Sequence, residues 1–236
     1  MKRSLTFILL LVLLLLLSGC DGSILPPLLG GSTPEPTPVP ISPEEMISYR
    51  AVYTVSLAPG EQVPGAQLAY VGKAESVYQV KIDGLVTNKR IGDSFAWRGI
   101  AAPGVYTAYN LRIGTEVLGE LAAAGTVDVM VLNPNPTALD ASLLPNRAPD
   151  YSGIIVSYTM PKGATIPGTT LQFVDVVSGQ AQIAGRVGYP YVAVADSLDW
   201  LGQLNENVIV RYNLRVSRID TESIRTDGTV DIWLVP

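Results

Sequence analysis

The sequence of 236 residues contains no histidine and a single cysteine. Without an imidazole there is no histidine general base, no histidine metal ligand, and no Ser-His-Asp or Cys-His catalytic arrangement. One cysteine also excludes an intrachain disulfide and a CxxC site. Charged residues make up only 16% of the chain and apolar residues 47%, which is unlike a disordered chain. We therefore expect no cofactor, no bound metal and no enzymatic activity.

The N-terminus has the features of a secretory signal peptide. Lys2 and Arg3 precede an apolar run over residues 5–17, which would span roughly 20 Å as a helix, short of the roughly 30 Å hydrocarbon core of a bilayer. The sequence Leu17-Ser18-Gly19-Cys20 resembles the lipobox of bacterial lipoprotein signal peptides. The resemblance implies that residues 1–19 are removed and that Cys20 is lipidated, anchoring the protein to the cell membrane on its extracytoplasmic side. The alternative is an ordinary signal peptide or membrane anchor with a chance cysteine.

The charge balance of the processed chain is acidic. Without Lys2 and Arg3 the chain has 14 basic side chains against 21 acidic ones, a net charge of −7. An acidic exterior argues against a nucleic-acid partner and against electrostatic adhesion to anionic lipids. The lipid on Cys20, rather than charge, is therefore expected to hold the protein at the membrane.

Residues 20–45 form a lipidated N-terminus and a proline-rich linker. Such a composition favours extended polyproline II conformations, and at about 3.1 Å per residue some twenty residues could reach roughly 60 Å. The pattern at Ser42-Pro43-Glu44-Glu45 predicts a single helical turn at its end. The prolines of this stretch are Pro26, Pro27, Pro34, Pro36, Pro38, Pro40 and Pro43.

The rest of the chain repeats itself. Placing residues 51–133 on residues 154–236, at a constant offset of 103 and without gaps, gives 19 identities in 83 pairs, where composition alone would give roughly five or six. The identities include the words Tyr-Asn-Leu-Arg, starting at Tyr109 and Tyr212, and Gly-Thr-Val-Asp, starting at Gly125 and Gly228. We infer a tandem duplication: module 1 (residues 46–133), a linker (residues 134–150) and module 2 (residues 151–236).

Each module reads as all-β. Short segments rich in Val, Ile, Tyr and Thr alternate with turn residues about every ten positions, which favours a β-sandwich of the immunoglobulin-like kind, with a small closed barrel as the alternative. Asp83-Gly84 predicts a type I′ hairpin turn, Gly125 and Asp227-Gly228 are interpreted as turns as well, and the linker is expected to hold one helical turn around residues 138–144. The expected strands cover residues 49–57, 67–71, 77–82, 85–91, 95–98, 105–113 and 126–132 in module 1, and 154–160, 170–177, 189–195, 208–217 and 229–235 in module 2.

Residues kept in both modules are expected to specify the fold, because two modules need the same core but not the same ligand. Trp97 and Trp200 are interpreted as core anchors, the alternative being exposed platforms for sugar rings. The remaining matched residues are expected to form an ion pair or a turn clamp in each module, the alternative being a polar site present twice; they are Asp93 and Arg112 in module 1, and Asp196 and Arg215 in module 2.

Residues that differ between the modules are the better candidates for a binding surface. Tyr189 and Tyr191 stand where module 1 has Val86 and Asn88, and they could form an aromatic contact surface. In module 1 the same region has a small basic cluster, which is interpreted as a solvated hairpin edge because edge strands often carry lysine; its members are Lys81, Lys89 and Arg90.

These observations favour a non-catalytic, membrane-anchored lipoprotein that binds an envelope protein or a glycan through its tandem β modules. Two alternatives belong to other classes. One is a structural spacer that sets a distance from the membrane. The other is a carboxylate-dependent, glycan-active hydrolase, whose candidate pairs are Asp196 with Asp199 and Asp227 with Asp231.

Overall fold

The computed structural model describes residues 46–235, so the predicted signal peptide, Cys20, the proline-rich stretch and the predicted helical turn at residues 42–45 lie outside the described residues. The described part of the chain consists of strands and one 3-10 turn, and none of its helices is long and apolar enough to cross a membrane. The strands of module 1 are β1 (Met46–Leu57), β2 (Leu68–Ala74), β3 (Val77–Ile82), β4 (Leu85–Lys89), β5 (Ser94–Ala102), β6 (Val105–Val117) and β7 (Glu120–Leu132). After β8 (Thr137–Ala138) in the linker, module 2 contains β9 (Tyr151–Pro161), β10 (Gln172–Val177), β11 (Gln180–Ala184), β12 (Tyr191–Val192), β13 (Ser197–Asn205), β14 (Val208–Ile219) and β15 (Ser223–Leu234).

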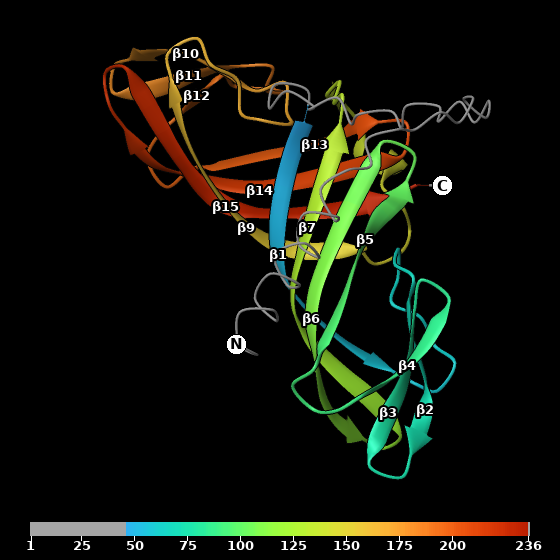
Figure 1. Cartoon of the computed structure of the whole chain (residues 1–236). Helices are drawn as coiled ribbons and strands as arrows, with labels where there is room; N and C mark the ends of the chain where they lie inside the picture. The colour runs from blue at the N-terminus through green and yellow to red at the C-terminus, as the bar shows by residue number, and fades with distance from the viewer. Residues whose placement is uncertain (1–45, 236) are drawn as a thin grey trace, which may run out of the picture. The chain divides into compact units, whose positions relative to one another are not determined.

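The strands form four antiparallel sheets (Figure 1), so the predicted all-β class is confirmed. Module 1 has a four-stranded sheet in the order β1-β7-β6-β5 and a three-stranded sheet in the order β2-β3-β4. Module 2 has the same two orders, β9-β15-β14-β13 and β10-β11-β12. The one difference is β8, which adds a fifth strand beside β13.

The alternation of apolar and polar residues determines which face of each sheet is buried. In β6, Tyr109 and Leu111 are buried while Asn110 and Arg112 are exposed. The equivalent strand β14 repeats this pattern at its own Tyr-Asn-Leu-Arg word. The core face therefore carries the aromatic and aliphatic side chains of the repeated words, and the polar side chains face solvent.

One predicted turn is confirmed. Asp83 and Gly84, the only residues between β3 and β4, have φ angles of 49° and 83°. Two successive residues with positive φ are what a type I′ turn requires.

The turns expected at Gly125 and at Asp227-Gly228 are wrong, because these residues lie inside β7 and β15. A Cβ atom on Gly125 would overlap the carbonyl oxygen of Asn110, and one on Gly228 would overlap that of Asn213. The glycine of the repeated Gly-Thr-Val-Asp word therefore allows a close approach of neighbouring strands.

The linker differs from its expected form. The structure places a 3-10 turn at Ala141–Leu143, within the expected helical turn, and caps it by the Asp140 carboxylate, which accepts a hydrogen bond from the Ser142 amide. Ahead of this turn lies β8, a strand that the sequence pattern did not predict. Two further strands, β11 and β13, were also not predicted, and β12 is shorter than the expected 189–195.

The hydrophobic core is one cluster of buried residues drawn from both modules. Tyr49 of β1 hydrogen-bonds Tyr212 of β14 at 2.6 Å between hydroxyl oxygens, and Tyr151 of β9 hydrogen-bonds Tyr109 of β6 at 2.9 Å. Tyr109 and Tyr212 each donate their single proton to a proline carbonyl, that of Pro64 or Pro167 at 2.8 Å. Each module thus inserts one tyrosine from its first long strand against the repeated tyrosine of the other module.

Candidate functional site

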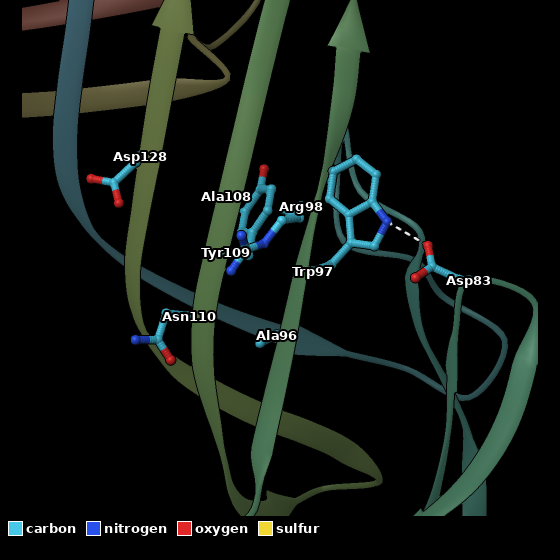
Figure 2. A pocket seen from close by; sticks show the side chains of 8 residues that line it. All are labelled: Asp83, Ala96, Trp97, Arg98, Ala108, Tyr109, Asn110 and Asp128. Carbon is cyan, nitrogen blue, oxygen red and sulfur yellow. Dashed lines mark hydrogen bonds between the residues drawn. The ribbon is translucent and has the colours of Figure 1, made fainter. Parts of the chain in front are cut away.

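A hollow with a volume of about 540 Å³ lies on module 1 (Figure 2). It is formed by the outer face of the sheet at β5, β6 and β7, together with the turn between β3 and β4. Its lining residues are Asp83, Ala96, Trp97, Arg98, Ala108, Tyr109, Asn110 and Asp128.

Small side chains create this hollow. Ala96 and Ala108 point outward from β5 and β6, where a larger residue would fill the space. At its rim, the Trp97 indole donates to the Asp83 carboxylate at 2.7 Å, which fixes the indole against the hairpin turn (Figure 2). The Trp97 ring also lies 6.3 Å from that of Tyr109, measured between centroids. The hollow thus has an aromatic edge and a polar rim.

Charged groups occupy the other side of the hollow. Asp128 accepts two hydrogen bonds from Arg50, at 2.6 Å and 2.9 Å, in the forked geometry typical of an arginine–carboxylate pair. The pKa of the Arg50 guanidinium is raised, first by this hydrogen bond and then by the charge of Asp128. The exposed Arg98 side chain adds a second positive group.

The equivalent hollow of module 2 is smaller, about 280 Å³. It surrounds Trp200, whose indole donates to Thr170 at 3.0 Å, and one wall is made by Ala138 and Leu139 of the linker. Module 1 has no such wall among its described residues.

On the outer face of the larger sheet of module 2, side chains fill the space that is open in module 1. Arg211 takes the place of Ala108, and it donates to Asp231 at 2.7 Å. Its guanidinium lies 5.6 Å from the ring centroid of Trp233, which stands in place of Met130. The Trp233 indole donates to the linker carbonyl of Arg147 at 3.0 Å. The linker therefore covers this face as well as the edge of β13.

The matched residues lie in structural positions. Trp97 and Trp200 are buried in the core, with 8% and 5% of their surface exposed, and neither is a flat exposed platform. In each module, an aspartate and an arginine side chain hydrogen-bond to backbone groups of the same turn, and we call this arrangement the turn clamp. Among the described residues, no ion pair joins the two side chains. Asp93 accepts from the Arg90 amide and Arg112 donates to the Gly92 carbonyl, while Asp196 accepts from the Ala193 amide and Arg215 donates to the Ala195 carbonyl.

The side-chain rings of Tyr189 and Tyr191 lie next to each other in the structure. Their ring centroids are 5.4 Å apart with an angle of 57° between the planes. Tyr189 is 65% exposed, and it is flanked in sequence by Val187 and Val194, which are 96% and 55% exposed. We name these four residues the aromatic patch. Arg186 donates to the Tyr189 carbonyl at 2.7 Å, which holds the loop that carries it.

The carboxylate pairs considered for hydrolysis are engaged elsewhere. Asp231 binds Arg211 and accepts from the Gly153 amide at 2.9 Å, and Asp227 pairs with Arg225. Asp196 belongs to the turn clamp, and Asp199 lines the smaller hollow. Among residues 46–235, no group of three acidic, histidine or cysteine side chains is placed to hold a metal ion.

No pattern in the sequence predicted the hollow of module 1. Of its charged lining residues, Asp83 belongs to the predicted Asp-Gly turn and Asp128 to the repeated Gly-Thr-Val-Asp motif, whereas Arg98 belongs to no motif. The available signal was Ala96 and Ala108, because alanine at two outward positions of paired strands leaves space on a sheet face.

The chain was compared with protein-family models, curated proteins and solved structures, and none of them matches it. No family, fold relative or known activity is therefore assigned by similarity.

Proposed function

We propose that this chain is a non-catalytic, lipid-anchored lipoprotein that binds a partner in the cell envelope through its tandem, sandwich-like β modules. The lipobox resemblance at Leu17–Cys20 supports the anchor and the extracytoplasmic side. The constant offset of 103 and the shared strand order support a duplication of one module.

The observation that carries the binding role is the aromatic patch. An exposed tyrosine beside a half-buried one, with exposed valines nearby in the sequence, is the kind of surface that partner proteins and sugar rings contact, because each tyrosine offers an apolar ring with a polar end. The patch lies on a loop fixed by the Arg186 hydrogen bond and by the pairing of β12 with β11. A fixed loop loses little conformational entropy on binding.

The two modules differ at this position, which favours a binding protein over a spacer. The equivalent hairpin of module 1 exposes Leu85, Val86 and Ile91, at 75%, 58% and 61%, and it has no aromatic residue there. A spacer needs no difference between its modules. A binding protein gains specificity when one module carries a surface that the other lacks.

The binding role is tested with the full chain and a double variant, Tyr189→Ser with Tyr191→Ser. The matched control is Leu85→Ser with Ile91→Ser, which removes a similar exposed apolar area from module 1. A glycan array measures carbohydrate binding, and photo-crosslinking from position 187 in intact cells measures protein contacts. We expect binding or crosslinking that the tyrosine variant loses at least tenfold and the control retains. Equal signals in all three chains contradict the proposal.

The anchor is tested separately by Cys20→Ser. We expect the unaltered chain in the membrane fraction and the variant, after signal cleavage, in the soluble fraction. A cleaved variant that still fractionates with membranes refutes lipid anchoring but leaves the binding role standing.

A further inference from the structure

The hollow of module 2 and the aromatic patch share one loop. This loop joins β11 to β12 and carries Arg186 and Val187, which line the hollow, as well as Tyr189. The Arg186 guanidinium donates to the Tyr189 carbonyl at 2.7 Å, so a side chain of the hollow holds the backbone that carries the tyrosine. Val187 belongs to both the hollow and the patch. The two features are therefore neighbouring parts of one surface.

Buried residues and the linker give this hollow a fixed shape. Trp200 and Leu171 line it, and both belong to the hydrophobic core. The Trp200 indole is held by its hydrogen bond to Thr170. On the linker side, the Leu139 amide donates to the Leu201 carbonyl at 3.0 Å, just beyond the pairing of β8 with β13. A hollow whose walls are already held loses little conformational entropy when a ligand binds.

Strand β13 adds two polar side chains to the hollow. Ser197 and Asp199 alternate with the buried Leu198 and Trp200, so both point away from the core, and both line the hollow. Among residues 46–235, the Asp199 carboxylate joins no ion pair. Because Asp199 is exposed, its oxygens are open to a ligand.

The polar groups of the hollow match the chemistry of a sugar. The Arg186 guanidinium only donates hydrogen bonds, the Asp199 carboxylate only accepts them, and the Ser197 hydroxyl does both. Each hydroxyl of a sugar ring also donates and accepts, so it can bind to any of the three. The charges of Arg186 and Asp199 cancel, which favours a neutral ligand over an ionic one. The volume of about 280 Å³ lies at the lower end of the range for small-molecule pockets, roughly 300–1,000 Å³, as expected for one sugar ring.

We propose that the hollow of module 2, together with Tyr189, binds a neutral glycan. One sugar ring lies in the hollow with its hydroxyls hydrogen-bonded to Asp199 and Arg186, and a neighbouring ring of the glycan packs on the exposed face of Tyr189. An anionic sugar is disfavoured because its charge would face the Asp199 carboxylate. This inference rests on the proposed binding role, and it names the partner as a glycan rather than an envelope protein.

Module 1 lacks this combination of groups. At the offset of 103, its residues in place of Asp199, Arg186 and Tyr189 are Ala96, Asp83 and Val86. The acceptor, the donor and the aromatic ring are thus missing together, and the Asp83 carboxylate is engaged by the Trp97 indole. The proposed glycan site therefore belongs to module 2 alone. Ala96 also shows that the fold needs no carboxylate at this position.

A glycan array probed with the full chain and two variants tests the site. The probes are neutral oligosaccharides of glucose, galactose and N-acetylglucosamine, with anionic oligosaccharides for comparison. The test variant is Asp199→Ala, which introduces the residue found in module 1. The matched control is Glu206→Ala, which removes another exposed carboxylate from the turn at the far end of β13.

We expect the unaltered chain to bind at least one neutral oligosaccharide. Asp199→Ala should weaken this binding at least tenfold, because a hydrogen bond to a charged group is lost. Glu206→Ala should bind as the unaltered chain does. The circular dichroism spectra of the three chains should coincide, since both substituted side chains are exposed.

Several results overturn the glycan site. They are an array without a neutral ligand, full binding by Asp199→Ala, and an equal loss in Glu206→Ala. Binding to anionic glycans alone, weakened by added salt, also overturns it, because recognition would then depend on charge.

Photo-crosslinking from position 187 separates this inference from the proposed binding role. A protein contact that the Tyr189→Ser and Tyr191→Ser double variant loses, with no glycan bound, refutes the glycan site and leaves the binding role standing. Glycan binding that the double variant loses and Asp199→Ala retains has the same meaning. Neither glycan binding nor a crosslink in the unaltered chain contradicts both.

Discussion

Modules 1 and 2 have the same strand order but differ at one edge and on one face of the larger sheet. In module 2, the linker strand β8 covers the edge of β13, and Arg211 and Trp233 fill the outer face of the larger sheet. In module 1, the same face carries the smaller Ala108 and Met130, and a hollow lies beside Trp97. Both modules share the buried tryptophan, the glycine that allows neighbouring strands to approach closely, and the turn clamp. Packing therefore constrains the residues inside each module, whereas the outer faces differ because, among the described residues, the linker packs against that of module 2 alone.

The largest expected effect tests whether the two modules unfold together. Trp97→Ala and Trp200→Ala each remove a buried indole, and we expect each to lower the free energy of unfolding by about 3–5 kcal/mol. Because one core cluster includes residues of both modules, a single cooperative transition should shift in both variants. Urea unfolding followed by circular dichroism measures this. Two separate transitions, of which a variant moves only one, would show independent modules.

A smaller effect should distinguish the two repeated Pro-Gly turns. Gly65 and Gly168 both have positive φ, 68° and 77°, so alanine at either costs about 1 kcal/mol in backbone strain. A Cβ on Gly168 would also overlap the hydroxyl of Tyr212 and approach that of Tyr49, while one on Gly65 makes ordinary contacts. We expect Gly168→Ala to cost about 3 kcal/mol in total. Equal shifts in the thermal midpoints of the two variants would contradict this difference.

The repeated Gly-Thr-Val-Asp word ends in an aspartate that has different surroundings in each module. Asp231 is 8% exposed and binds Arg211 and the Gly153 amide. We expect Asp231→Ala to cost about 2 kcal/mol, because its partners lose charged hydrogen bonds. Asp128 pairs with an exposed arginine, so Asp128→Ala should change stability far less. Chemical denaturation of the two variants measures the difference, and a larger loss for Asp128→Ala would reverse the comparison.

A pH dependence of stability is expected at the tyrosine contacts between the modules. Burial raises the pKa of Tyr109, Tyr49 and Tyr212 above the ordinary tyrosine value, and it raises the pKa of Tyr151 to about 12. Above about pH 10 the unfolded chain loses these protons while the folded chain keeps them, so stability falls as pH rises. Each such tyrosine contributes up to about 1.4 kcal/mol per pH unit.

Tyr151→Phe removes the hydrogen bond between Tyr151 and Tyr109 and leaves the one between Tyr49 and Tyr212 in place. The variant should show a shallower decline of stability between pH 10 and pH 12, because one of the raised pKa values is gone. Unfolding free energies measured at pH 8, 10 and 11 give the slope. An unchanged slope would show that Tyr151 ionises alike in the folded and unfolded states.

The sequence predicted much of module 1 and less of module 2. The hairpin β3–β4 was predicted with its turn, since Asp-Gly has a strong local preference for the type I′ geometry. The strand β11 was not predicted, because its short Gln-Ala-Gln-Ile-Ala segment carries little β propensity and is stabilised by pairing with β10 and β12. The local pattern wrongly predicts turns at Gly125 and Gly228, because it does not show which backbone lies across from a glycine.

One of the two candidate sites could be identified from the sequence, and the other could not. Tyr189 and Tyr191 could be identified because the sequence differs there between modules, and their rings lie close together because the two residues are only two positions apart. The hollow of module 1 could not be identified, because Asp83 and Asp128 are far apart in the sequence and line the same hollow only when β5, β6, β7 and the β3–β4 turn are assembled.

The sequence by itself determined the all-β class, the repeat at an offset of 103 and the alternation that buries Tyr109 and Tyr212, because each depends on residues that are neighbours or exact repeats. Only the tertiary structure decided that the linker becomes a fifth strand beside β13 and that the tyrosines of the two modules bind one another. The physical reason is that pairing at a sheet edge and contact between cores depend on backbone groups and surfaces brought together from distant positions. Composition and local pattern carry no information on those distances.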